Sequence, residues 1–231
     1  GDSVYRQRIA MMLDELPEPD DLRQTVARRA KMGDPRKDAP TVTGRPTDSK
    51  KFLRSYALVD IQTGKAVGTK TRFKVRWDDE GAVIFEIKCD EPDMKNLFVT
   101  DDVWTGDSIA IQLETQGHAY YQIEVNPDGK IFDADRHGRL NQRWKSNATV
   151  ETERGADFWS VVVRIPVVDA EEGASDPNHH VVGAKPGMDS PWYMNVGRSR
   201  VRPSGKTSWS FPHTGKPSYH VPERFAKMVI E

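Results

Sequence analysis

The strongest constraint on the fold is an alternation of apolar and polar residues with a period of two, beginning near residue 52. Phe73, Val75 and Trp77 alternate with basic residues, and the alternation resumes after a polar turn at 78–81. Successive side chains of a strand point to opposite faces, so this pattern predicts strands with one buried face. The same pattern recurs at 83–87, 109–113, 121–125 and 159–165.

Polar turns separate these stretches, and the strongest is the Asn-Pro-Asp-Gly sequence at 126–129. The strand that begins at Trp159 is expected to stop at Pro166, and shorter strands are expected at 192–196 and 226–230. No helical periodicity lies between the strands. The pattern therefore predicts an all-β fold, an antiparallel β-sandwich.

The first part of the chain has a different periodicity. Apolar residues at helical spacing predict one short helix over 4–16 and a second that ends at Gly33. Two short helices cannot bury a core alone, so this segment (1–33) either docks on the sandwich or ends a preceding domain. A Pro- and Asp-rich stretch (34–50) is expected to be a linker or a meandering edge segment, and the sandwich to cover 51–231.

Charge and composition exclude several classes of partner. The 34 basic and 35 acidic residues interleave and give a net charge of −1, which does not favour a nucleic-acid or anionic-membrane partner. The longest apolar runs are a few residues, far below the roughly 20 that a spanning helix needs. The single cysteine, Cys89, excludes an intrachain disulfide and a cysteine-based metal cluster. The first residue is Gly, so we expect a fragment of a longer protein.

The order of several short motifs, rather than one motif, carries a resemblance. Over about 68–231 the chain resembles the carbohydrate-binding modules of family 9. The matching elements, in order, are Val75 to Asp78, Val103 to Ile109, Tyr121 to Gly129, Trp159 to Pro166, Tyr193 to Val196 with Arg198 and Arg200, Ser208 to Ser210, and Pro222 to Phe225.

This resemblance implies a jelly-roll-like sandwich without catalytic machinery. In family members that bind sugar, two aromatic side chains clamp the faces of a terminal sugar ring, and the matching positions here are Trp104 and Tyr219. The chain departs from the family at Ala110, where binding members carry Glu, and at Glu124, where they carry Arg.

The chemistry of a sugar explains why these residue types fit. A pyranose has two weakly polar C–H faces, and a flat aromatic ring can cover one of them. Its rim of hydroxyl groups can form hydrogen bonds with carboxylates and with planar donors such as guanidinium and amide groups. Candidate polar contacts are Gln122, Glu124, Arg198 and Arg200, followed by Arg202. The competing interpretations are structural. Trp104 would pack within its loop, and the arginines would form a solvated or salt-bridged face of a strand.

No cofactor is expected. Clustered carboxylates could hold calcium, but their spacing matches no calcium-loop pattern, so solvated turns are the favoured interpretation. The carboxylates concerned are Asp78, Asp79, Asp101, Asp102 and Asp107. We also consider a glycosidase, which would need two carboxylates about 5 to 9.5 Å apart, and a haem protein using Met94, Met188 or Met194.

The favoured function is a non-catalytic carbohydrate-binding module attached to a polysaccharide-processing protein. Its expected partners are an oligo- or polysaccharide and neighbouring domains of the same polypeptide, with no nucleic acid and no membrane span. The expected location is extracellular or periplasmic. The alternative is a structural interdomain β-sandwich that no longer binds sugar.

Overall fold

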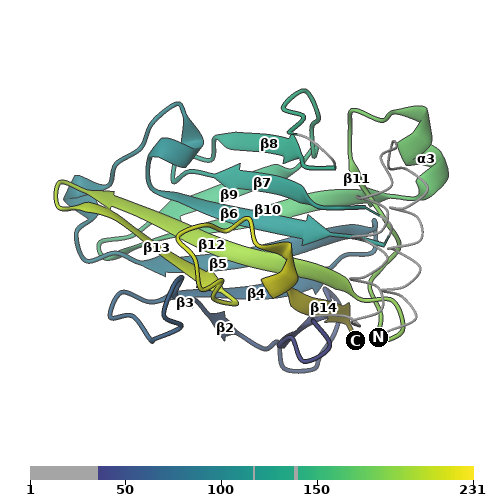
Figure 1. The fold of residues 1–231 in the computed structure, drawn as a ribbon, viewed down its shortest axis with the longest axis horizontal. Coiled ribbons are helices and arrows are strands. Elements are labelled where there is room, and N and C mark those ends of the chain that lie inside the picture. Colours follow the sequence, from purple (N-terminus) through teal and green to yellow (C-terminus); the bar gives the residue numbers. More distant parts are fainter. Residues whose placement is uncertain (1–35, 117, 138–139) are drawn as a thin grey trace, which may run out of the picture.

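The computed structural model describes residues 36–116, 118–137 and 140–231, so the helical segment expected at 1–33 lies outside the described residues. The regular secondary structure of the described part is mostly strand (Figure 1). The strands are β1 (Thr41–Pro46), β2 (Tyr56–Ala57), β3 (Val59–Asp60), β4 (Thr71–Trp77), β5 (Ala82–Asp90), β6 (Ser108–Glu114), β7 (Tyr121–Val125), β8 (Ile131–Asp135), β9 (Thr149–Arg154), β10 (Phe158–Val168), β11 (Val181–Val182), β12 (Trp192–Arg202), β13 (Gly205–Phe211) and β14 (Ala226–Ile230). The helical turns are η1 (Met94–Asn96), η2 (Val103–Thr105), α3 (Ala170–Ser175) and η3 (Pro222–Arg224).

The strands form two layers that overlap in the view of Figure 1. Sheet A has the order β14-β12-β6-β7-β8, with β13 pairing both β12 and β3. Sheet B has the order β11-β10-β5-β4, with β9 on β10 and β2 on β4. Most pairs are antiparallel, as predicted, and the exceptions are the parallel pairs of β1 with β14, β1 with β4, and β10 with β11. The all-β sandwich predicted from the sequence is confirmed.

The alternation seen in the sequence places the predicted apolar residues between the two sheets. Each alternating stretch contributes one buried face, and the facing side chains form one continuous core. Its members include Phe73, Val75, Trp77, Val83, Phe85, Ile87, Ile109, Ile111, Leu113, Tyr121, Ile123, Val125, Trp159, Val161, Val163 and Ile165. Aromatic contacts across this core include the edge-on pair of Trp77 and Trp192, whose ring centroids are 5.9 Å apart.

Strand β1 lies inside the segment (34–50) that the sequence analysis expected to be a linker or a meandering edge segment. Thr41 to Gly44 pair with β14 of sheet A, whereas Arg45 and Pro46 pair with β4 of sheet B, so this strand joins the two sheets at their edge. The apolar signal is weak because only Val42 of this strand is a large buried hydrophobic residue. Its strand character comes from pairing with distant segments, which local composition does not reveal.

Strand β10 continues through Pro166 and ends at Val168, so the expected end at Pro166 is wrong. The backbone N–H of Val167 donates to the Gly81 carbonyl, and alternation therefore turns the nitrogen of Pro166 away from β5. On that other side, the pairing with β9 has already ended at Arg164. The missing N–H of proline thus leaves the ladder intact.

Within 36–116, 118–137 and 140–231, no helix has the length and apolar character needed to cross a bilayer.

The joining strand β1 provides a test of the fold. A Cβ added at Gly44 would lie 2.5 Å from Ile230 Cδ1 and 3.0 Å from the Val75 carbonyl oxygen. We therefore expect Gly44→Ala to lower the free energy of unfolding by about 1–3 kcal/mol, the usual cost of overpacking. Urea unfolding at neutral pH measures this. Gly68→Ala is the matched control, because no atom lies within 4 Å of its added Cβ. Equal stability of the two variants would contradict the close packing of β1.

Candidate functional site

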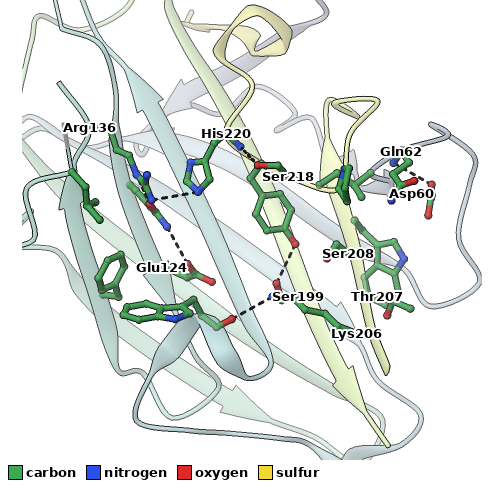
Figure 2. Close-up of a pocket in the computed structure, with 18 of the residues that line it drawn as sticks. Asp60, Gln62, Glu124, Arg136, Ser199, Lys206, Thr207, Ser208, Ser218 and His220 are labelled. Carbon is green, nitrogen blue, oxygen red and sulfur yellow. Dashed lines mark hydrogen bonds between the residues drawn. The ribbon is translucent and has the colours of Figure 1, made fainter. Parts of the chain in front are cut away.

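A cleft of about 790 Å³ lies on the outer face of sheet A, the face turned away from the core. Strand β7 contributes Gln122 and Glu124 to its lining, β12 contributes Ser199, and β13 contributes Ser208. The loop before η3 and the turn η2 form the sides. Figure 2 shows these side chains, with Arg136 and His220 at one end of the cleft and Asp60 at the other.

The phase of the strands explains why this outer face is both polar and hollow. On β7, Ile123 and Val125 point into the core, so Gln122 and Glu124 point outward. Across the sheet, Ala110 is paired with Glu124 on one side and with Gly197 on the other. Because Gly197 has no side chain, the ring of Tyr219 can lie directly above this part of the sheet. Ala110, a departure from the family pattern, is paired with the lining residue Glu124 and is not itself part of the cleft lining.

The two predicted aromatic residues both line this cleft. Trp104 lies on η2, is 42% exposed, and contacts Phe132 edge-on at 4.5 Å between ring centroids. Tyr219 lies on Gly197 so closely that an added Cβ there would be 2.4 Å from its ring. Its hydroxyl is 3.2 Å from Ser199 Oγ, and burial raises the pKa of Tyr219 to about 12, so the phenol stays neutral.

Glu124 is held in a fixed orientation beneath the cleft. Its Oε1 accepts a hydrogen bond from Ser108 Oγ at 2.7 Å, and its Oε2 accepts from Gln122 Nε2 at 3.2 Å. Burial raises the pKa of Glu124 because its charged form loses hydration. The carboxyl is therefore a positioned hydrogen-bonding group of the kind that orients a ligand in a pocket.

Sequence reasoning missed the polar end of the cleft. Arg136, directly after β8, donates from Nε to Gln122 Oε1 at 2.9 Å, and its Nη2 is 3.4 Å from His220 Nε2. His220 Nδ1 is 3.2 Å from Gln112 Nε2 and 3.1 Å from the Tyr120 hydroxyl. Burial and the nearby Arg136 charge lower the pKa of His220 to about 4, so the ring is neutral at pH 7. The one available signal was the position of His220 next to Tyr219.

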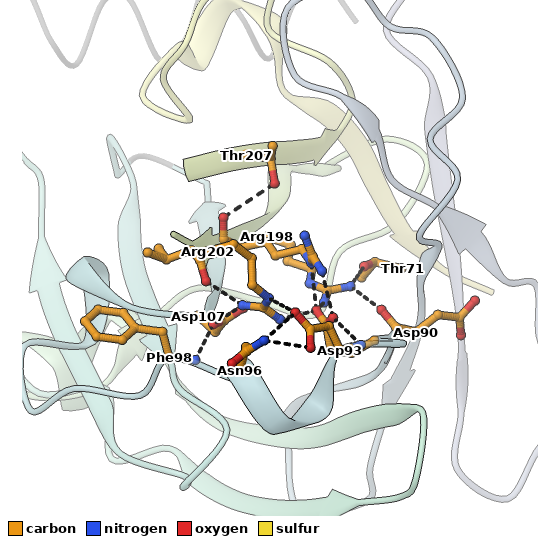
Figure 3. Close-up of polar contacts among 12 residues, drawn as sticks. Thr71, Asp90, Asp93, Asn96, Phe98, Asp107, Arg198, Arg202 and Thr207 are labelled. Carbon is orange, nitrogen blue, oxygen red and sulfur yellow. Dashed lines mark hydrogen bonds and ion pairs between the residues drawn. The ribbon is translucent and has the colours of Figure 1, made fainter. Parts of the chain in front are cut away.

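Arg198 and Arg200, predicted as sugar contacts, are not among the residues that line the cleft. Figure 3 shows the polar contacts around Arg198 and Arg202. Arg198 is fully buried in the sandwich, donates to Thr71 Oγ1 at 3.0 Å, and lies over the Trp209 ring at 4.8 Å. Arg200 donates from two nitrogens to the two oxygens of Glu91, at 2.8 and 2.9 Å. These contacts are those of a structural ion-pair network.

The phase of β12 accounts for this difference. Met194 and Val196 face the core, so the next alternate residues of the strand, Arg198 included, face the same side. Asn195, Gly197 and Ser199 face outward, towards the cleft side. The side chain of Arg202 joins the inner set through Glu91 and through Asp107, 2.8 Å from its Nη1.

Glu91 is the acceptor on which this cluster converges. Its carboxylate lies within 2.9 Å of Arg198, Arg200 and Arg202 nitrogens and is fully buried. Burial alone would raise the pKa of Glu91, but the hydrogen bonds from Arg200 and Arg202 outweigh it and lower the pKa to about 2. The folded protein therefore keeps this carboxylate charged throughout the neutral and mildly acidic range.

The ion-pair network around Glu91 predicts that neutralising this buried carboxylate strongly lowers the stability of the fold. Glu91→Gln leaves buried guanidinium groups without a countercharge, so we expect it to lower the free energy of unfolding by about 3–5 kcal/mol. Glu86→Gln is the matched control: it removes the half-exposed Arg76 pair, and we expect less than about 1 kcal/mol. Urea unfolding at pH 7 compares them, and similar losses would contradict the assignment.

The contribution of Glu91 to the free energy of unfolding is expected to fall as the pH falls. The unfolded chain protonates Glu91 near its ordinary pKa of 4.5, whereas the folded protein does so near about 2. The stability that this carboxylate supplies is complete above pH 4.5 and is lost as the pH falls towards 2. The difference in stability between the wild type and Glu91→Gln should therefore narrow over that interval.

Three of the five carboxylates considered for calcium pair with basic side chains. Asp78 pairs with Arg164 and Asp101 pairs with Lys130, while Asp107 pairs with Arg202 as described above. In the described part of the chain, no group of three or more His, Cys, Asp or Glu side chains is placed to hold a metal ion.

Comparison with known proteins gives structural neighbours only. No family model matches the sequence, and no curated protein matches it. A structure of a candidate carbohydrate-binding protein from Bacteroides uniformis aligns over 84% of this chain and all of its own, with a TM-score of 0.61 and 14% identity.

Two structures of a family 9 module from Caldicellulosiruptor kristjanssonii also align. The complex with cellotriose has a TM-score of 0.54 and 11% identity, over 83% of this chain and 93% of its own. The complex with glucose has a TM-score of 0.55 and 10% identity, over 83% and 96%. Likeness at such low identity establishes the fold. The described chain therefore has the fold of the family 9 carbohydrate-binding modules, as the order of its sequence motifs predicted.

Proposed function

We propose that this protein is a non-catalytic carbohydrate-binding module, and that a sugar ring stacks on Trp104 and Tyr219 in the cleft of sheet A. One observation carries the proposal: four residues chosen from the sequence as sugar contacts line a single cleft in the structure. These residues are Trp104, Tyr219, Gln122 and Glu124.

The cleft has the two kinds of group that a sugar needs. Trp104 offers an exposed aromatic surface for a C–H face, and covering about 100 Å² of it contributes roughly 2 kcal/mol. Gln122 and Glu124 offer hydrogen-bonding groups with fixed orientations for the hydroxyl rim. Their mutual hydrogen bond fixes their geometry before a ligand arrives, which lowers the ordering cost of binding.

A binding role is favoured over hydrolysis. The carboxylates that line the cleft are Glu124 on the floor and Asp60 at the rim. Asp60 Oδ1 already accepts hydrogen bonds from the backbone N–H of Gln62 and Thr63 and from Thr63 Oγ1. An acceptor committed to its own turn is poorly suited to protonate a leaving group. The fold neighbours are binding modules as well.

The partners follow from this function. We infer an oligo- or polysaccharide ligand and attachment to a polysaccharide-processing protein, with an extracellular or periplasmic location where such polymers occur. A module of modest affinity is effective in that setting, because linkage to a second domain raises the effective concentration at the polymer.

The aromatic pair provides the primary test. We expect Trp104→Ala and Tyr219→Ala each to weaken sugar binding by roughly tenfold or more, since each removes one stacking surface. A panel of xylo-, cello-, manno-, galacto- and uronic-acid oligosaccharides is screened by intrinsic tryptophan fluorescence, and affinities are measured by calorimetry. Phe52→Ala is the matched control, because Phe52 is 85% exposed and lies outside the cleft. No change in tryptophan fluorescence with any sugar would instead support the alternative, a structural interdomain module.

The contact beneath Tyr219 provides a second test. A Cβ at Gly197 would lie within 2.8 Å of three atoms of the Tyr219 ring, so Gly197→Ala must displace that ring. We expect this variant to fold and to weaken sugar binding about as much as Tyr219→Ala. Gly187→Ala, where the added Cβ meets nothing within 4 Å, is the control. Calorimetry gives the affinities, and unchanged binding by Gly197→Ala would remove Tyr219 from the proposed site.

A further inference from the structure

Two cations of the cleft, Arg136 and Lys206, have no carboxylate partner among the residues that the structure describes. Within the described strands, by contrast, every arginine has a carboxylate within 4.0 Å. Those paired arginines are Arg45, Arg72, Arg76, Arg154, Arg164, Arg198, Arg200 and Arg202. Arg136 lies directly after β8 and lines the cleft of sheet A.

Arg136 is held in place by neutral groups. Its Nε donates to Gln122 Oε1 and its Nη2 contacts His220, while Nη1 has no hydrogen-bond partner in the described part of the chain. His220 is neutral at pH 7, as described above. A guanidinium oriented by neutral neighbours keeps its charge uncompensated, and its planar fork matches the two oxygens of a carboxylate.

Lys206 lies beside the aromatic surface. Its Nζ is 3.3 Å from the backbone oxygen of Trp104, so its charge is adjacent to the residue proposed to stack on the ring. In the view of Figure 2, Glu124 and Ser199 lie between Lys206 and Arg136. Both cations act on Glu124 and lower its pKa, while the larger effect of burial raises it.

The two carboxylates that line the cleft, Glu124 and Asp60, do little to offset the positive charge at the Arg136 end. Glu124 is buried, and both of its oxygens accept hydrogen bonds from protein groups. Asp60 lies at the opposite end from Arg136 in Figure 2, where its own turn donates to its carboxylate. The middle of the cleft and the Arg136 end thus favour an anionic group on the ligand.

We propose that the cleft selects a sugar that carries a carboxylate, a uronic acid, which Arg136 binds through its fork while Lys206 adds a second positive charge beside the stacked ring. This inference rests on the proposed sugar-binding function and adds the class of sugar. A carboxylate bound by such groups gains charge-assisted hydrogen bonds that a neutral hydroxymethyl group in the same position lacks.

The test compares each uronic-acid oligosaccharide with its own carboxyl-reduced form, which keeps the stereochemistry and linkage but removes the charge. Galacturonate, glucuronate and mannuronate oligosaccharides of equal length are titrated by calorimetry. We expect at least one acidic form to bind about tenfold or more tightly than its reduced counterpart. Added salt should weaken binding of the acidic form more than that of the reduced form.

The variants assign the effect to the two cations. Arg136→Gln and Lys206→Gln should each lower the ratio of acidic to reduced affinity towards one. Lys185→Gln is the matched control, because Lys185 is exposed and lies outside the cleft. Circular dichroism and thermal unfolding establish that each variant is folded. Lys206 is exposed, so its substitution keeps the test valid if Arg136→Gln proves unstable.

Three results would overturn the inference while leaving the proposed sugar-binding function in place. Equal affinity for acidic and reduced forms, lost in Trp104→Ala, would keep the sugar site but exclude selection of a carboxylate. A ratio unchanged by both Arg136→Gln and Lys206→Gln would exclude these two residues as its cause. Tighter binding of sulfated than of uronic-acid oligosaccharides would assign the charge to sulfate instead. If neither form of any sugar binds, the proposed function falls together with the inference.

Discussion

The phase of strand β12 determines which residues of this protein can meet a ligand. Met194 and Val196 contribute to the apolar core, and strict alternation then places Arg198 inside the sandwich and Gly197 outside it. Tyr219 can approach the outer face closely because Gly197 has no side chain. A shift of one residue in this strand would exchange the two faces and remove both the core contacts and the hollow above them.

Burial of Arg198 creates a charge that must be neutralised, and Glu91 does so together with neighbouring guanidinium groups. The cluster connects β12 with the end of β5, so it ties sheet A to sheet B at one end of the sandwich. At the edge of the sandwich β1 makes a second connection by pairing first with β14 and then with β4. The cleft lies on the outer face of sheet A, and sheet A is joined to sheet B by these two connections.

Much of the fold was predictable because a period of two is a local property. Residues such as Phe85, Ile111 and Val163 could be assigned to a buried face from their neighbours alone. The cleft lining was partly predictable, since the resemblance pointed to Trp104 and Tyr219, and side-chain chemistry pointed to Gln122 and Glu124. Arg198 and Arg200 were chosen for their chemistry, whereas the alternation extended from Val196 places them on the inner face, away from the cleft lining.

The sequence by itself determined the class of fold, the positions of the main strands and the aromatic candidates, because these depend on periodicity and on the order of short motifs. Only the tertiary structure brought Arg136, Lys206 and His220 to one cleft, since they lie on separate strands and loops and no local pattern relates them. It also decided that β1 belongs to the sandwich. Pairing between distant segments and the burial of individual charges arise from the folded chain as a whole.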